Sequence, residues 1–329
     1  MATTASRTAM GQEDRTLLAR APRSLWSDAR RRLLRNKAAV AGLIYIALLA
    51  IIAIAAPLIA PHPPLQIYPG NTYRQAAWIE TPNNPRTSGS WDYPLGTDAI
   101  GRDVLSRLIF GTRTSLVVGF IPMVLTLVIG TTVGLIAGYR GGWVDTLLMR
   151  IADIVFSFPS LLFFIIVMSA LKNTPIGKVW NGFLILFAAL SVVEWVGVSR
   201  LVRGQILSLK EKEFVEAART IGVRNHNILL RHLLPNSLGP IIVAGAFIVP
   251  GAIITEAVLS YLGIGLPPAT KAGALFPVSW GNMILDGKGA LQAQPWLMIA
   301  PAVAIASITL AFTFLGDGLR DALDPRQNQ

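Results

Sequence analysis

The chain has 329 residues, of which 53% are hydrophobic and 14% are charged, and its mean hydropathy is +0.54. Soluble domains carry about 25% charged residues, so this composition indicates that most of the chain is solvated by lipid. There is no cysteine and there are three scattered histidines, which excludes disulfides and cysteine nucleophiles and disfavours a zinc site. The net charge of +11 is spread between apolar segments, which favours membrane topology over nucleic-acid binding as its explanation.

A helix needs about 20 consecutive apolar residues to cross the hydrocarbon core. Six segments meet this requirement, which predicts an all-α polytopic membrane protein with six transmembrane helices. The predicted spans are residues 38–60, 115–139, 147–171, 180–201, 238–262 and 295–315. The first contains Ala53-Ile54-Ala55, which is typical of a signal-cleavage site. Its apolar run is longer than the ~7–15 residues of a removable signal, so we expect an uncleaved span.

Lys and Arg are distributed unevenly between the spans. If the N-terminus is cytoplasmic, twenty of the 29 fall on the cytoplasmic side and nine fall outside. Because cytoplasmic loops carry an excess of Lys and Arg, we expect both termini in the cytoplasm. The chain then divides into a cytoplasmic tail (1–37), a first span (38–60), an extracytoplasmic segment (61–114), a five-helix core (115–315) and a cytoplasmic tail (316–329). The core includes a cytoplasmic loop (202–237) and an extracytoplasmic loop (263–294).

The cytoplasmic loop holds a charged, short-helix segment between two long apolar spans. Residues 209–221 are good helix formers, and Phe214, Ala218 and Ile221 have the spacing of one helix face. Gly222 follows directly, at the position where a helix end favours a residue that adopts positive φ without strain. The pattern therefore predicts an amphipathic helix that ends at a glycine turn.

A second amphipathic stretch covers residues 225–234, and we expect Pro235 to end it before the next span begins. The whole segment is then a helix, a glycine turn and a helix at the membrane surface. Glu216 offers a carboxylate to a basic group of a partner, and the small Ala217 and Ala218 let another backbone approach. The alternative is a passive connection whose amphipathic helices rest on lipid headgroups.

The run EAARTIG at residues 216–222, followed by Leu234-Pro235, resembles the EAA loop of type I ABC-importer permeases. Three further blocks resemble the second, C-type subunit of the oligopeptide, dipeptide and nickel branch. These blocks are RLLRNK at 32–37 with APLIAP at 56–61, PLGTDAIGRDVLSR at 94–107, and GDGLRDALDP at 316–325. The resemblance covers roughly residues 30–326. Tyr93 and His232 depart from the residues common in these patterns, and residues 62–92 match nothing in them.

The resemblance implies a type I importer fold, in which spans two to six pack against a homologous permease subunit as a heterodimer. It also implies two ABC ATPase subunits that carry ATP and Mg, an extracytoplasmic peptide-binding protein, and a place in the bacterial cytoplasmic membrane. This chain has no GxxxxGK[ST] phosphate loop, so it cannot itself bind ATP in that way. We expect no catalytic residue, cofactor or metal on it. The resemblance assigns ATPase coupling to Glu216, Ala217, Ala218, Gly222, Arg224, His232 and Pro235.

Four ionisable residues lie in or near the predicted spans, where a charge is costly unless it is paired or faces water. Arg150 and Asp153 are three residues apart, so we expect them to neutralise each other, with a role in the pathway as the alternative. Glu194 either lines the pathway or makes an interhelical hydrogen bond. Glu256 either lines the pathway or stabilises the fold.

The leading hypothesis is a permease subunit for di- or oligopeptides that forms half of a translocation pathway and couples to ATPases through the loop. The alternative is the same architecture importing nickel or another small solute, although no predicted span contains a histidine, which favours peptides. A proton-coupled secondary carrier using Asp153 and Glu194 is less favoured. The spans show no inverted repeat, and such a carrier leaves the loop unexplained.

Overall fold

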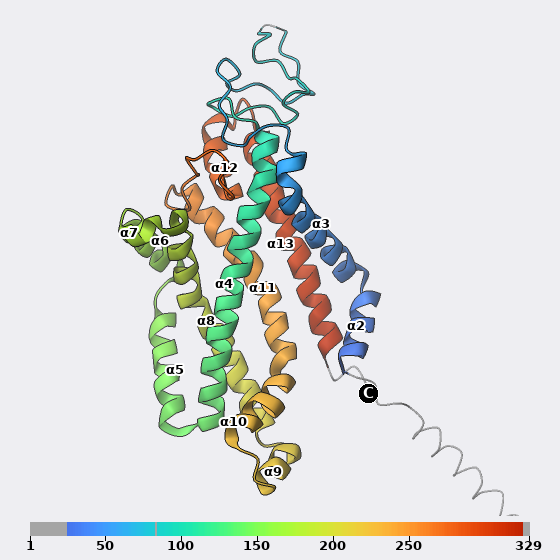
Figure 1. Ribbon diagram of the computed structural model, residues 1–329, viewed down its shortest axis with the longest axis vertical. Coiled ribbons are helices and arrows are strands. Elements are labelled where there is room, and N and C mark those ends of the chain that lie inside the picture. The colour runs from blue at the N-terminus through green and yellow to red at the C-terminus, as the bar shows by residue number, and fades with distance from the viewer. Residues whose placement is uncertain (1–24, 83, 325–329) are drawn as a thin grey trace, which may run out of the picture.

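Helices run along the length of the molecule, and an irregular cap of loops covers one end (Figure 1). The computed structural model describes residues 25–82 and 84–324, so the outermost parts of the two predicted tails lie outside the described residues. Within the described residues, β-structure is limited to two isolated bridges in the cap. We call the capped end the outer end, and the opposite end, which carries α9, the inner end.

The predicted all-α architecture is confirmed. The long helices are α3 (Lys37–Ile59), α4 (Val104–Arg140), α5 (Gly142–Ser157), α6 (Ser160–Leu171), α8 (Phe183–Leu209), α11 (Leu234–Tyr261) and α13 (Trp296–Leu323). The shorter elements are α2 (Leu25–Arg35), α7 (Pro175–Lys178), η1 (Val179–Gly182), α9 (Glu213–Thr220), α10 (Asn225–Asn227), η2 (Ile228–Leu233), α12 (Trp280–Gly287) and η3 (Lys288–Ala290). Five helical stretches of the described residues are long and apolar enough to cross a membrane, and the bent pair of α5 and α6 makes a sixth if it counts as one span.

The third predicted span, residues 147–171, is not one continuous helix. It consists of α5 and α6, which meet at an angle of 79°. Phe158 is extended (φ −83°, ψ 134°) and Pro159 precedes the first residue of α6. The proline ring disfavours a helical conformation of the residue before it, so an uninterrupted apolar run breaks into two helices at this point.

Two helix boundaries differ from the predicted spans because hydropathy locates only the apolar part of a helix. The segment at residues 61–114, which was expected to lie outside the membrane, includes the first turns of a long helix, since α4 begins at Val104. Asp103 starts this helix by accepting a hydrogen bond from the backbone N–H of Ser106 (3.0 Å). At the other end of the molecule, α8 continues to Leu209 rather than ending at residue 201, so the predicted loop at residues 202–237 begins within a helix.

Three glycines on one face of α4 allow this helix to lie directly against α8. Gly130, Gly134 and Gly138 are buried and are spaced four residues apart. A Cβ atom on Gly134 would lie 2.6 Å from the carbonyl oxygen of Ser199 and 2.7 Å from Cβ of Val202. Membrane helices approach closely through such small residues because lipid supplies no hydrophobic force between helices, which leaves packing to hold them together. The contact of α4 with α8 is accordingly the most extensive between described elements.

Two arginines and two aspartates fasten the cap to the outer ends of α4 and α12. Asp98 accepts hydrogen bonds from Arg102 Nε (2.7 Å) and Arg107 Nη1 (2.5 Å). Asp286 accepts from the Nη2 atoms of the same two arginines (3.0 and 2.7 Å). Arg107 is only 2% exposed, and a charge so buried requires this pairing. Residues 94–107, the most distinctive block of the sequence, therefore form the joint between cap and helices.

We expect Gly134→Ala to destabilise the protein, because the added methyl group meets backbone atoms of α8 that cannot move independently. Such overpacking costs about 1–3 kcal/mol. Gly204→Ala on α8 is the matched control, since a Cβ there meets nothing within 4 Å. Alanine favours helix by about 1 kcal/mol over glycine, so the control is expected to be neutral or stabilising. Thermal unfolding of the purified chain in detergent measures both, and equal midpoints would contradict the close packing.

Candidate functional site

The segment between α8 and α11 projects from the inner end of the molecule (Figure 1). α8 ends at Leu209, and Lys210 Nζ donates a hydrogen bond to the carbonyl oxygen of Gly138 at the end of α4 (3.2 Å). Further along, Tyr139 Oη of α4 donates a hydrogen bond to Asn225 Oδ1 (2.8 Å). The segment is thus fastened to α4 both before and after α9.

α9 turns one face toward the bundle. Val215 and Ala218 are buried in an apolar cluster formed with side chains of α4, α8, η2 and α11. Ala218 is buried, whereas Phe214 and Ile221, which have the spacing of the same helix face, are 41% and 79% exposed. A helix of about two turns that lies across other helix ends covers only a narrow strip of its own surface, so this face of α9 is only partly buried. The strip is the pair Val215 and Ala218.

The outward face of α9 combines apolar and charged groups. Glu216 and Ala217 are exposed together with Phe214 and Ile221. The Glu216 carboxylate forms no hydrogen bond or ion pair with another described residue. Neighbouring exposed aromatic and aliphatic side chains are a feature of surfaces that another protein covers.

Gly222 ends α9 as predicted. Its φ is +79°, which an L side chain rarely adopts. The N–H of Val223 donates to the carbonyl oxygen of Ala218 (3.0 Å), and the N–H of Gly222 donates to that of Arg219 (3.0 Å). These two bonds form a Schellman motif, which satisfies the last carbonyl groups of the helix and fixes the direction of the chain that follows.

The second amphipathic stretch continues into α11 instead of ending at Pro235. The π-helical turn η2 leads into α11, which begins at Leu234 and has Pro235 in its first turn. The predicted role of Pro235 as a terminator is wrong, because the first turn of a helix tolerates a residue without an N–H. Arg224 and Pro235 are exposed, as docking residues must be. His232 is half-buried, and its carbonyl oxygen accepts a hydrogen bond from Asn236 Nδ2 (2.6 Å).

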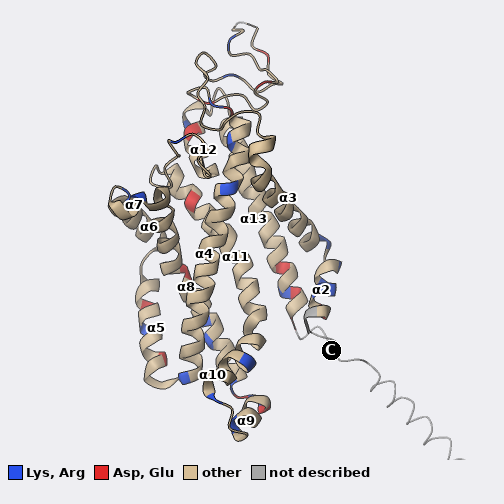
Figure 2. Cartoon of the chain, in the orientation of Figure 1, with Lys and Arg blue, Asp and Glu red and all other residues tan. Residues whose placement is uncertain are grey.

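Charged residues are sparse along the long helices (Figure 2), and two ion pairs join α5 to α8. Arg200 Nη2 donates to Asp153 Oδ1 (2.7 Å), and Arg203 donates twice to Asp145 (2.6 and 2.7 Å). The predicted pairing of Arg150 with Asp153 is wrong, since Arg150 is exposed and forms no ion pair with a described residue. A guanidinium reaching from a packed neighbouring helix makes a better-directed bond than an i, i+3 neighbour. The ion pair of Asp145 with Arg203 was not predicted. The sequence signal for it is the presence of aspartates near one predicted span and of arginines near the end of the next.

The two glutamates within the spans have opposite surroundings. Glu256 is buried and accepts hydrogen bonds from Ser260 Oγ (2.6 Å) and Ser279 Oγ (2.7 Å). These hydrogen bonds join α11 to the start of α12, which favours a fold-stabilising role for Glu256 over a place in the pathway. Glu194 is exposed on α8 and makes no interhelical hydrogen bond with the described residues. Gly197 lies about one turn further along α8, and a Cβ atom added there would meet nothing within 4 Å.

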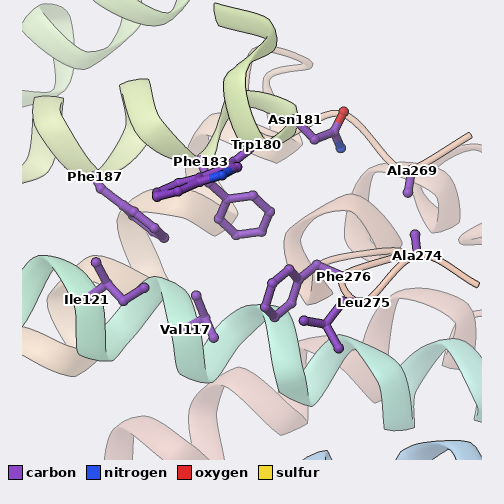
Figure 3. A pocket seen from close by; sticks show the side chains of 10 residues that line it. All are labelled: Val117, Ile121, Trp180, Asn181, Phe183, Phe187, Ala269, Ala274, Leu275 and Phe276. Atoms are coloured by element: carbon purple, nitrogen blue, oxygen red, sulfur yellow. The ribbon is translucent and has the colours of Figure 1, made fainter.

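A pocket of about 430 Å³ lies in the outer half of the molecule, between α4, η1, α8 and the loop before α12 (Figure 3). Trp180 and Asn181 have positive φ (48° and 55°), and Asn181 Nδ2 donates a hydrogen bond to the carbonyl oxygen of Pro267 (2.8 Å). The pocket was not predicted from the sequence, although Asn181-Gly182 is a turn signal that could have marked it. Its lining is Val117, Ile121, Trp180, Asn181, Phe183, Phe187, Ala269, Ala274, Leu275 and Phe276.

Comparison with known proteins places this geometry in a family. The family model described as "Binding-protein-dependent transport system inner membrane component" matches residues 130–329, and "N-terminal TM domain of oligopeptide transport permease C" matches residues 24–77. The chain is 42% identical to the oligopeptide transport system permease protein OppC of Haemophilus influenzae, with 92% of this chain and 89% of that protein covered. It is 40% identical to the dipeptide transport system permease protein DppC of Alkalihalophilus pseudofirmus, with 92% and 90% covered.

The fold also resembles a solved structure, an inward-facing conformation of the MetNI methionine ABC transporter. The TM-score is 0.52 at 18% identity, and the match covers 66% of this chain and 96% of that chain. This likeness supports the type I importer fold that the loop pattern predicted. The chain therefore belongs to the family of binding-protein-dependent transport system inner membrane components, the multi-pass permeases of ABC importers.

Proposed function

We propose that this chain is one of two homologous permease subunits of an ATP-driven importer of di- or oligopeptides, and that α9 docks an ATPase subunit. Relatives named as oligopeptide and dipeptide permeases support the peptide substrate. The observation that carries the docking proposal is the geometry of α9. Its inner face belongs to the apolar cluster of the bundle, while Glu216 on its outer face stays exposed and unpaired within the described chain.

A push on α9 reaches the spans through packed side chains. Val215 and Ala218 share their apolar cluster with Val202 and Ile206 of α8 and with Ile241 of α11. Close-packed side chains transmit a displacement instead of absorbing it, so movement of α9 moves α8 and α11 with it. ATP and Mg are held by the partner ATPases, and this chain contributes no catalytic group.

The second permease completes the translocation pathway, and an extracytoplasmic peptide-binding protein delivers substrate at the outer end. The pocket there supports peptide over nickel as the substrate. Its lining contains Trp180, Phe183, Phe187 and Phe276 and includes no carboxylate, imidazole or sulfur ligand for a transition metal. Aromatic and aliphatic walls suit the side chains of a peptide instead.

We expect Glu216→Ala to weaken association with the ATPase subunits by about tenfold or more, because it leaves a basic group at the interface unpaired. Co-purification with the second permease and the ATPases, followed by ATP-driven peptide uptake in proteoliposomes, measures this. Glu211→Ala removes the same charge just before α9 and is the matched control. Normal uptake by Glu216→Ala at wild-type expression would show that the segment is a passive connection. Uptake without any second permease would contradict the heterodimer.

The same uptake assay distinguishes the contribution of the turn at Gly222 from that of the docking face of α9. Gly222→Val places a β-branched residue at a φ of +79° and is expected to abolish coupling while the chain still inserts normally. Gly222→Asn is its control, since asparagine tolerates the left-handed region. The ligand affinity of the binding protein should be unchanged in both. Equal loss of uptake in the valine and asparagine variants would show that the turn geometry is not the cause.

The orientation follows from the excess of Lys and Arg at the inner end, which we assign to the cytoplasm together with both termini. The chain has no cysteine, so single cysteines report topology cleanly. An impermeant maleimide applied to intact cells should label Lys271→Cys in the loop before α12 and leave Ser208→Cys unlabelled. Both positions are exposed. Labelling of Ser208→Cys and protection of Lys271→Cys would show that the chain has the opposite orientation.

Glu194 is the proposed pathway residue of this chain. A carboxylate within a span is costly in lipid, and this one has no partner among the described residues, so it faces water in the assembled importer. A water-soluble maleimide should therefore modify Glu194→Cys in proteoliposomes. Ile51→Cys on α3, which is 62% exposed but flanked by apolar residues, should stay unmodified in lipid. An unreactive Glu194→Cys would place this position against a partner helix.

A further inference from the structure

α2 has two faces that differ in their chemistry. Ala29 and Leu33 are turned toward the bundle and are buried or half-buried. The opposite face carries Arg30, Arg31 and Arg35, all of them exposed. Figure 2 shows Lys and Arg residues on α2 at the side of the molecule, next to α3.

The inner face holds α2 in one orientation. Gly318 of α13 allows the approach, since a Cβ there would lie 3.3 Å from Leu33 Cδ1 and in contact with Ala39. Arg32 Nη1 donates a hydrogen bond to the carbonyl oxygen of Asp324 (3.3 Å). Asn36 is the single residue between α2 and α3. Its Oδ1 atom caps α3 by accepting hydrogen bonds from the N–H groups of Ala38 (3.1 Å) and Ala39 (3.2 Å). The outward direction of the arginine face is therefore fixed by the fold.

The outer face lacks partners within the described residues. Arg30, Arg31 and Arg35 form no ion pair or hydrogen bond there. The acidic residues within α2 and in the last turns of α13 also leave them unpaired, since Asp28, Asp317 and Asp321 form no ion pair with them. Three adjacent cations that the fold holds outward and leaves uncompensated favour an anionic ligand.

An apolar side chain lies in the middle of this basic face. Leu34 is 55% exposed between the arginines. Two residues beyond α2 the span α3 begins, and its Ile44 and Leu48 are exposed like the lipid-facing side of a membrane helix. A basic helix with a leucine in its outer face, continuous with a transmembrane helix, has the composition of a helix in the membrane interface.

We propose that the outer face of α2 is a binding site for anionic phospholipid headgroups. Arg30, Arg31 and Arg35 bind the phosphate oxygens, and Leu34 inserts at the boundary of the acyl chains. The site is separate from the proposed ATPase-docking face, since α2 packs on α3 and α13 whereas α9 packs on η2. Because α2 is locked to α13, an occupied headgroup site holds the first span in place beside the core.

The test uses the full-length chain, purified in neutral detergent and titrated with phosphatidylglycerol or phosphatidylcholine in mixed micelles. Bound lipid is counted by native mass spectrometry. The variant Arg30→Gln/Arg31→Gln/Arg35→Gln is expected to bind phosphatidylglycerol roughly tenfold or more weakly than the wild type. Its matched control, Arg86→Gln/Lys178→Gln/Lys271→Gln, removes three exposed charges near the outer end and should bind as the wild type does.

Leu34→Ser keeps every charge and tests the apolar part of the site, with weaker binding of phosphatidylglycerol expected. Unchanged thermal unfolding of each variant confirms that α2 stays in place. Equal phosphatidylglycerol binding by the wild type and the α2 triple variant would overturn the proposal. So would equal binding of the two lipids by the wild type. Loss of ATPase co-purification in the α2 variant with lipid binding intact would instead make this face a protein contact, which also overturns it.

Discussion

The direct contact of α4 with α8 is the constraint on which the inner end of the molecule depends. Gly130, Gly134 and Gly138 contribute no side chain to this contact, so Val198, Val202 and Ile206 of α8 lie directly against the backbone of α4. Val202 and Ile206 of α8 can therefore reach the cluster on which α9 rests. A larger residue in the glycine ridge would push α8 away from α4 and remove the support of α9. The proposed docking face is thus positioned by residues that never touch a partner.

Charges inside the helices obey a related constraint, because a charge within a span is costly unless a neighbouring element or water satisfies it. Asp145 receives two hydrogen bonds from Arg203, and Glu256 receives two from serine hydroxyl groups. A carboxylate bonded in this way stabilises the packing of helices and offers little to a substrate. Glu194 has no such partner among the described residues. This contrast separates the proposed pathway residue from the structural ones.

Local physical properties of the sequence determined the helical class, the six apolar spans and the turn at Gly222. A run of apolar residues needs lipid whatever surrounds it, and a helix end that reverses direction needs positive φ, which glycine supplies. The exposed carboxylate of Glu216 also followed from its place in a short amphipathic helix. The break at Pro159 was readable in the same way, but the unbroken hydropathy of residues 147–171 concealed it.

Only the tertiary structure decided which helices lie next to each other, and several features depend on that choice. Asp153 pairs with Arg200 instead of Arg150 because α5 packs along α8. Val215 rather than Phe214 is buried because α9 lies across the ends of other helices. The pocket and the outward arginines of α2 likewise arise where separate segments meet. Periodicity and composition describe one element at a time, whereas pairing and burial are properties of two elements in contact.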